Sequence, residues 1–203
     1  MTKAYKIPRP FFLLFLVFFA TTLFLSIFYD KIDLHLIINQ WRHPWADVFF
    51  KYFTHLGDGV LFVPAIIYFS VQKDTEKVIL FILIAVLTLS VTALGKSVLF
   101  PDINRPVLAI GADKLNLVEG VRMHSKFSFP SGHTMAAFAY WSAMAAVAHG
   151  SFAGLFALIA VLVGISRVYL SQHFVPDVAA GSVLGIMITE ICFRLHSLFL
   201  TKK

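Results

Sequence analysis

The sequence predicts an all-α integral membrane protein with six transmembrane helices. Of the 203 residues, 59% are hydrophobic and only 14% are charged, and the mean hydropathy is +0.81. A soluble domain carries about 25% charged residues, so this chain has too few polar side chains to cover a water-exposed surface. The uncharged runs 11–29, 78–95 and 152–165 approach the roughly 20 residues with which a helix spans the hydrocarbon core of a bilayer.

The six predicted helices occupy most of the chain, so we expect a single domain over residues 1–203. They are expected at residues 11–29, 58–71, 76–100, 131–149, 151–170 and 176–200. The second is short and contains Pro64, which weakens a helix interior because proline has no N–H to donate. The first resembles a signal peptide, but its apolar run is longer than the usual core of about 7–15 residues and no small-residue cleavage site follows. We therefore expect it to be retained.

The distribution of lysine and arginine favours a cytoplasmic location for both termini. Each predicted face carries seven of these residues, but on one face they lie in short segments beside helix ends, as the positive-inside rule expects of the cytoplasmic side. That face holds Lys3, Lys6, Arg9, Lys73, Lys77, Lys202 and Lys203, and the other holds Lys31, Arg42, Lys51, Arg105, Lys114, Arg122 and Lys126. The sequence thus predicts a multi-pass cell-membrane protein with both ends inside.

Six spans with both ends inside place the unusual polar residues on one membrane face. The third helix then ends outside, near Lys96, and the fourth begins outside, at PSGH (130–133). The fifth ends outside near Arg167, and the sixth begins outside at Asp177. We therefore expect one polar site at the periplasmic or extracellular face.

The segment FPSGHT, residues 129–134, predicts an anion-binding helix start. Ser131 lies between Pro130 and Gly132, and serine is a favoured residue at a helix N-terminus. The first N–H groups of a helix are unpaired and the helix dipole is positive there, so this position attracts anions.

Three permanent cations, Lys96, Arg105 and Arg167, are expected to converge on this helix start. The planar fork of arginine matches phosphate oxygens, and lysine acts as a point charge. Cations near a membrane are costly without counter-charges, so an anionic ligand with several oxygens explains them best.

Two histidines and an aspartate complete the predicted chemistry. Asp177 follows His173 by four residues across a helix start, so its carboxylate can accept from one ring nitrogen and leave the other as a nucleophile. His133 can protonate a departing oxygen and later activate a water. These residues predict a two-step phosphoryl transfer through a phosphohistidine, with no metal and no cofactor.

Three motifs resemble those of the type 2 phosphatidic acid phosphatase (PAP2) family, which shares its core with vanadium haloperoxidases. They are KSVLFPDINRP at 96–106, PSGH at 130–133 and SRVYLSQHFVPD at 166–177. The second and third match the family patterns throughout. In the first, eight residues separate Lys96 from Arg105 where the family usually has six. The resemblance implies a six-helix membrane bundle of PAP2 type with its catalytic motifs within 96–177.

The same resemblance assigns roles to individual residues. It implies that His173 is the nucleophile, Asp177 its orienting partner and His133 the general acid. It also implies that the phosphoryl oxygens are held by Lys96, Arg105, Ser131, Gly132 and Arg167.

The activity implied by the resemblance is hydrolysis of a lipid phosphate ester or diphosphate within the bilayer, expected in a bacterial inner membrane. Undecaprenyl pyrophosphate is the first expected substrate and a lipid A phosphate the second; phosphatidylglycerophosphate and phosphatidic acid are further candidates. One alternative is a lipid phosphotransferase that uses the same phosphohistidine. Another is a non-catalytic binder or transporter of anionic lipids, which the complete nucleophile–acid pair disfavours. Nucleic acid is not an expected partner, because the basic residues form no continuous stripe.

Two further segments are candidates for substrate selection. Residues 30–55 mix charges with aromatic side chains, which predicts a helix lying in the membrane interface beside a lipid entry, or only an anchoring aromatic belt. Arg122, His124 and Lys126 precede PSGH and could meet a substrate headgroup, or form an ordinary solvated loop.

The other histidines and the single cysteine carry weaker signals. Cys192 permits no disulfide within the chain and lies in an apolar segment. His43, Asp47 and His55 could be imagined as a zinc site, but their spacing is not typical of one, so we expect no metal. His35, His43, His55, His124, His149 and His196 are expected to be interfacial or loop residues.

Overall fold

The fold is built from helices, and the computed structural model describes residues 5–148 and 152–200 without any strand among them. The α-helices are α1 (Arg9–Phe28), α2 (Lys31–Asn39), α3 (Pro44–Phe53), α4 (Phe62–Val71), α5 (Thr75–Leu94), α6 (Pro106–Ile110), α7 (Gly132–Val147), α8 (Ala153–Tyr169) and α9 (Val175–Leu200). Shorter turns are η1 (Thr54–Gly57), η2 (Gly59–Leu61) and η4 (Ala112–Lys114), with a π-helical turn η3 (Gly95–Leu99) that extends α5. The predicted all-helical class is confirmed.

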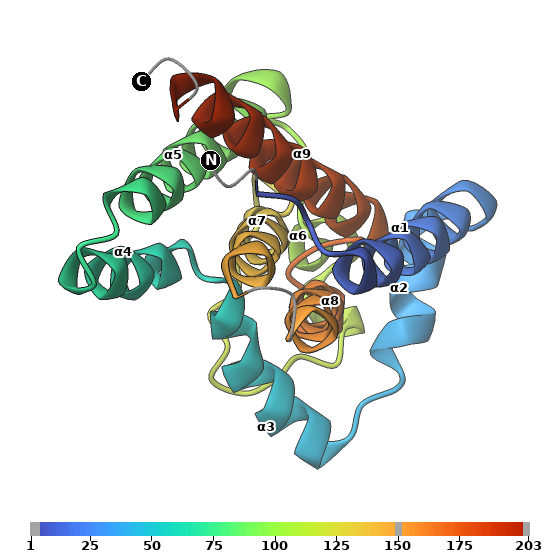
Figure 1. The fold of residues 1–203 in the computed structure, drawn as a ribbon. Coiled ribbons are helices and arrows are strands. Elements are labelled where there is room, and N and C mark those ends of the chain that lie inside the picture. Colours follow the sequence, from blue (N-terminus) through green and yellow to red (C-terminus); the bar gives the residue numbers. More distant parts are fainter. Residues whose placement is uncertain (1–4, 149–151, 201–203) are drawn as a thin grey trace.

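Helix α7 forms the centre of the bundle, with α5, α8 and α9 packed around it (Figure 1). Its sequence is rich in alanine, which lets neighbouring backbones approach closely. On α9, Gly181 and Gly185 face it: a Cβ on Gly185 would lie 2.5 Å from the carbonyl oxygen of Met135. Ser142 also donates a hydrogen bond of 3.0 Å from α7 to Thr189 on α9. Small residues therefore fix the distance between the two helices.

The outer helices bury one side and expose apolar side chains on the other, as lipid contact requires. The segments Arg9–Phe28, Thr75–Leu99 and Val175–Leu198 are long and apolar enough to cross a membrane. Helices Pro44–Gly57 and Gly59–Val71 qualify only as a pair bent by 52°, and α8 is apolar but shorter. The chain is therefore a multi-pass membrane protein, and the number of six spans stays a prediction.

The helix boundaries follow the predictions with two differences. The second predicted helix, expected from residue 58, starts with the turn η2 and becomes α-helical only at Phe62. The third ends in the π-turn η3 rather than in regular helix. The expected end of the fourth helix at residue 149 and start of the fifth at 151 lie outside the described residues, as do Lys3, Lys202 and Lys203.

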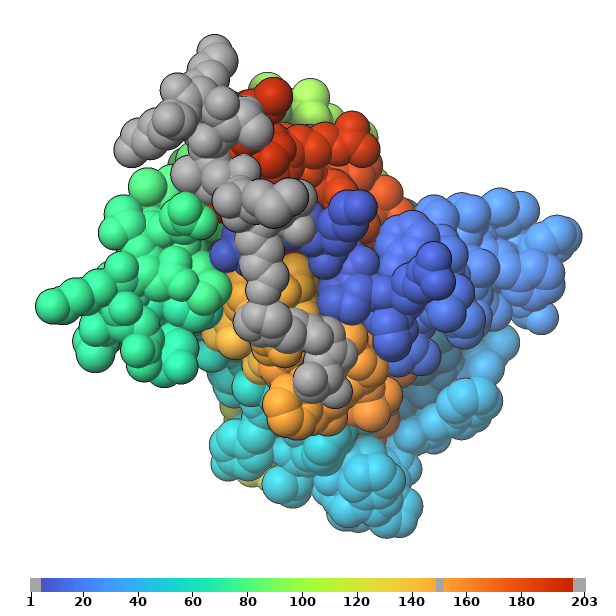
Figure 2. All heavy atoms as spheres, in the orientation of Figure 1, coloured from blue at the N-terminus to red at the C-terminus, as the bar shows by residue number. Residues whose placement is uncertain are grey.

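Both ends of the described chain lie at the same end of the bundle. The ring of Tyr5 is 5.7 Å from that of Phe193 and 5.5 Å from that of His196, near the end of α9. Figure 2 shows this face, with α1 beside α9 and the α4–α5 pair projecting on the side opposite α2. An even number of membrane crossings fits this arrangement.

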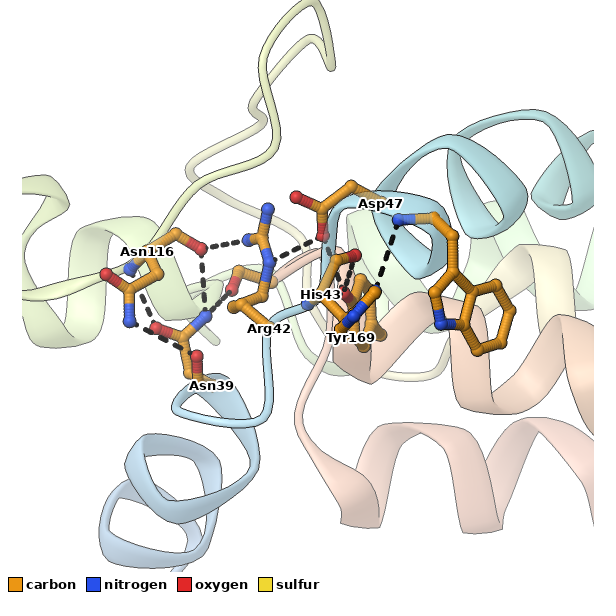
Figure 3. Close-up of polar contacts among 8 residues, drawn as sticks. Asn39, Arg42, His43, Asp47, Asn116 and Tyr169 are labelled. Atoms are coloured by element: carbon orange, nitrogen blue, oxygen red, sulfur yellow. Dashed lines mark hydrogen bonds and ion pairs between the residues drawn. The ribbon is translucent and has the colours of Figure 1, made fainter.

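The segment predicted to lie in the interface forms two helices, α2 and α3, joined by an elbow (Figure 3). Asn39, the last residue of α2, accepts from the Asn116 N–H at 2.7 Å, which ties the elbow to the loop before α7. Arg42 donates to Asp47 at 2.8 Å, and the Tyr169 hydroxyl donates to the same carboxylate at 2.5 Å, which ties it to α8. The exposed side chain of Trp41 lies in this elbow.

Candidate active site

The first, second and third sequence motifs meet at the end of the bundle opposite Tyr5. Lys96 from η3, Arg105 before α6, His133 in the first turn of α7 and Arg167 near the end of α8 line one cavity of about 590 Å³. Residues that lie up to 71 positions apart in the sequence are therefore brought to a single site, as the helix count predicts.

Lys96 lies in this cavity despite the longer first motif. The π-turn η3 and the turn that follows it take up the additional residues before Arg105. The Lys96 Nζ lies 3.5 Å from where a Cβ on Gly132 would be, next to the start of α7. The unusual spacing thus leaves the ammonium group beside the helix start.

His173 lies in the short loop between α8 and α9, and its side chain is buried. Its side chain is 1% exposed, and its Nδ1 lies 3.3 Å from Oδ2 of Asp177. Its other ring nitrogen, Nε2, is buried and has no hydrogen-bond partner among the residues described. His173 does not line the cavity, but Lys96, Arg105 and Arg167, which do, are among the charged groups that act on its ring.

Asp177 is fixed by more than the histidine. Its Oδ2 accepts from the Ser128 hydroxyl at 2.5 Å and from the Phe174 N–H at 3.0 Å. Its main-chain carbonyl accepts from the Ser131 N–H at 3.0 Å, which joins the start of α9 directly to the start of α7. The carboxylate therefore has little freedom to turn away from His173.

Ser131 and Gly132 shape the helix start rather than presenting side chains to the cavity. Ser131 is fully buried, and its hydroxyl oxygen accepts from the Thr134 N–H at 3.4 Å as the N-terminal cap of α7. A Cβ on Gly132 would lie 3.0 Å from Cγ2 of Thr92, so the site tolerates no larger residue without adjustment. Any contact from these two residues to an anion must come from the backbone at the positive end of the helix.

The two arginines are held in place by neutral oxygens and not by acids. Arg167 Nη1 donates to the Thr54 hydroxyl at 2.7 Å, and its Nε is buried without a partner among the described residues. Arg105 donates from Nε to the Lys126 carbonyl at 3.0 Å and from Nη1 to Oε1 of Gln172 at 3.1 Å. No aspartate or glutamate of the described chain lines the cavity, so its positive charge is left for a ligand.

The surrounding charge also sets the state of the candidate nucleophile. The pKa of His173 lies well below 6.5, first because burial removes water from the charged ring and then because Arg105 and Arg167 repel a further positive charge. Burial and the same two arginines, with Arg122, also lower the pKa of His124 at the mouth of the cavity. His173 is therefore neutral near pH 7, the state in which a ring nitrogen can attack phosphorus.

The three predicted headgroup residues separate in the structure. Arg122 and His124 line the outer part of the cavity, together with Lys51. Lys126 is exposed and does not line it; its carbonyl serves instead as the acceptor for Arg105. Among the described residues, no three His, Cys, Asp or Glu side chains are placed to hold a metal ion. Asp47, from the imagined zinc site, forms an ion pair with Arg42 instead.

Several residues at the site were not predicted as part of it. Thr54 contacts Arg167, Gln172 contacts Arg105, and Ser128 contacts Asp177. Asp58 lies 2.7 Å from the Nε2 of His133 and also contacts His55, which was expected to be a simple loop residue. The predicted topology could have indicated Asp58, because it begins the second predicted helix on the same membrane face as PSGH.

Two relatives of this chain are named as phosphatases. A model of the PAP2 superfamily matches residues 76–199. Phosphatidylglycerophosphatase B of Bacillus subtilis is 34% identical over 157 residues, which cover 72% of this chain and 73% of that protein. A lipid A 4'-phosphatase of Porphyromonas gingivalis is 27% identical over 173 residues, which cover 81% of this chain and 72% of the other.

Solved structures show the same relationship. LpxE of Aquifex aeolicus superposes with a TM-score of 0.68 at 30% identity and covers 82% of this chain and 96% of its own. The transmembrane PAP2-type phosphatidylglycerolphosphate phosphatase of Bacillus subtilis gives a TM-score of 0.60 at 27% identity, covering 96% of both chains. The likeness therefore extends well beyond the three motifs.

Proposed function

Because this chain belongs to the PAP2 superfamily of phosphatases, we propose that it removes phosphate from a membrane lipid through a phosphohistidine intermediate. The observation that carries this proposal is the state of His173. Its Nδ1 is held by Asp177, and its Nε2 has no partner among the described residues. The cavity presents the cations Lys96, Arg105 and Arg167, and no carboxylate of the described chain lines it. A bound phosphoryl group brings the negative charge that balances these cations, and its phosphorus is the atom that Nε2 attacks.

The reaction runs in two steps. In the first, Nε2 of His173 attacks phosphorus, the bond from phosphorus to the lipid oxygen breaks, and that oxygen takes a proton from His133. Asp177 keeps the attacking nitrogen aimed and stabilises the positive ring that forms. In the second, His133 takes a proton from water, the water oxygen attacks phosphorus, and the phosphorus–nitrogen bond breaks. Lys96, Arg105 and Arg167 stabilise the phosphoryl oxygens in both steps.

The cavity also supports a proposal about the substrate. It is larger than one phosphate group requires, and Lys51, Arg122 and His124 line its outer part. A headgroup with a second anionic group or a sugar fits this arrangement better than a bare phosphate monoester. Undecaprenyl pyrophosphate and lipid A phosphates meet this description, as does phosphatidylglycerophosphate. The names of the Bacillus subtilis and Porphyromonas gingivalis relatives support the last two.

A panel of lipids tests the proposal. We expect the purified protein in detergent to release phosphate from undecaprenyl pyrophosphate, a lipid A phosphate and phosphatidylglycerophosphate more efficiently than from phosphatidic acid. Release should be unchanged by a chelator, because every proposed role belongs to a side chain. Absence of phosphate release from the whole panel would contradict the proposed function, and loss of activity with chelator would contradict the metal-independent mechanism.

We also propose that the site lies at the periplasmic face with both termini in the cytoplasm. The contact of Tyr5 with Phe193 supports this placement, because it sets the chain ends opposite the catalytic cavity. A reporter fused to the C-terminus that becomes active only in the cytoplasm should be active in cells. An inactive reporter on a folded, membrane-inserted protein would reverse the orientation.

A further inference from the structure

The turn that precedes α4 is wedged between α7 and α8 at the edge of the cavity. A Cβ on Gly57 would lie 2.5 Å from Cγ1 of Val163 and 2.9 Å from the carbonyl oxygen of His133, so only glycine allows this approach. The indole of Trp141 donates to the Leu56 carbonyl at 2.9 Å. Contacts with both helices thus fix the backbone that leads into Asp58.

Each oxygen of the Asp58 carboxylate contacts a different imidazole. Oδ1 lies 2.7 Å from Nε2 of His133, and Oδ2 lies 2.7 Å from Nδ1 of His55. The carboxylate is 30% exposed and the His55 side chain 65% exposed, so His55 can turn away more easily than His133. The contact to His133 is therefore the one that the fold holds in place.

The charges around His133 indicate what the contact with Asp58 can do. Burial and the cations Arg167 and Lys96 of the same cavity oppose a positive charge on the ring, whereas the Asp58 carboxylate, in contact with Nε2 at 2.7 Å, favours it. A histidine that must donate a proton to a leaving oxygen needs a nearby carboxylate to stabilise its protonated form when cationic side chains line the cavity. No other carboxylate of the described chain contacts His133.

We propose that Asp58 is a positioning residue for His133: it holds Nε2 and leaves Nδ1 to exchange protons with the substrate. In the first step Nδ1 gives its proton to the departing lipid oxygen, and in the second it takes one from the attacking water. The site then contains two parallel pairs, Asp177 with His173 on the attacking side and Asp58 with His133 on the leaving side. This inference rests on the proposed phosphatase function.

The dependence of rate on the leaving group tests it. An alkyl or lipid oxygen needs a proton to depart, whereas 4-nitrophenolate leaves without one. The substitution Asp58→Asn keeps the shape of the side chain but removes its charge. We expect it to lower kcat/KM by about 100-fold for a lipid phosphate and by less than about threefold for 4-nitrophenyl phosphate.

The substitution Asp47→Asn is the matched control. Like Asp58, Asp47 has two side-chain partners, Arg42 at 2.8 Å and the Tyr169 hydroxyl at 2.5 Å, and its side chain is 28% exposed. Neither partner is among the residues to which the proposed mechanism gives a role. We expect it to leave the ratio of the two rates unchanged, and thermal unfolding in detergent shows whether each variant is folded.

The outcomes separate this inference from the proposed function. If folded Asp58→Asn slows both substrates equally, or neither, Asp58 does not act through the leaving-group acid and the inference is wrong. If it speeds the reaction, Asp58 competes with substrate for His133, which also overturns it. Failure of the wild-type protein on every lipid would instead overturn the function.

Discussion

Substituting His173 with alanine is expected to abolish phosphate release, with kcat falling by about 10⁴-fold or more. The loss is large because the substitution removes the proposed nucleophile, so the proposed covalent intermediate cannot form. His133 cannot replace it, because its Nε2 is held by Asp58 on the leaving-group side. Wild-type protein mixed with substrate and quenched rapidly should carry an acid-labile phosphate, and the alanine variant should carry none.

We expect the His173→Ala variant to fold, so that its loss of activity can be attributed to the missing nucleophile and not to unfolding. Nε2 of His173 has no partner among the described residues, and Asp177 keeps its bonds from Ser128 and Phe174. His196→Ala is the matched control, because that ring is also buried and its Nε2 lacks a partner within 5–148 and 152–200, but it lies near the opposite end of α9. Turnover that persists in folded His173→Ala, or that disappears in His196→Ala, would refute the assignment.

Substituting Gly181 with alanine is expected to cost both stability and activity. The added Cβ would lie 2.6 Å from the carbonyl oxygen of Ser131, and backbone cannot move aside as a flexible side chain can. Helix α9 must shift away from α7, which strains the hydrogen bond from the Ser131 N–H to Asp177. We expect a loss of about 1–3 kcal/mol in stability, measured as a lower Tm, and a strongly reduced kcat.

Substitutions at two other glycines separate the effect on the site from general destabilisation. Gly185→Ala creates a similar clash one turn further from the site, so it should lower Tm comparably but reduce kcat less. No atom of the described residues outside its own helix lies within 4 Å of a Cβ on Gly154, so Gly154→Ala should leave activity unchanged and raise stability by up to about 1 kcal/mol. Equal loss of activity in the first two variants would show that general destabilisation explains the effect.

The sequence predicts the parts of the site that stand in ordered motifs. Alternating helix directions bring Lys96, His133 and Arg167 to one face, because each lies near the end or start of a long apolar segment. The predicted pairing of His173 with Asp177 follows from a separation of four residues at a helix start, and the structure places the two in contact. These inferences need only the helical repeat and the number of crossings.

Contacts that depend on side-to-side packing could not be predicted in this way. Asp58 meets His133 only because Gly57 fits against both Val163 and the backbone of His133. This fit depends on the η1 turn, α7 and α8 together, so no hydrophobic periodicity within any one of these segments predicts it. The exposed position of Lys126 has the same origin, since the loop turns its carbonyl and not its side chain toward Arg105.

The central position of α7 has a consequence for how the protein is made. Most of its residues are buried against other helices, and it includes Thr134 and Ser142, so its place in the bilayer depends on protein neighbours more than on lipid. Its most extensive partner is α9, which is synthesised after α7 and α8. Until α9 is synthesised, α7 lacks its main packing surface and the loop at Ser131 lacks Asp177. The same helix therefore supplies both the packing surface of α7 and the partner of Ser131.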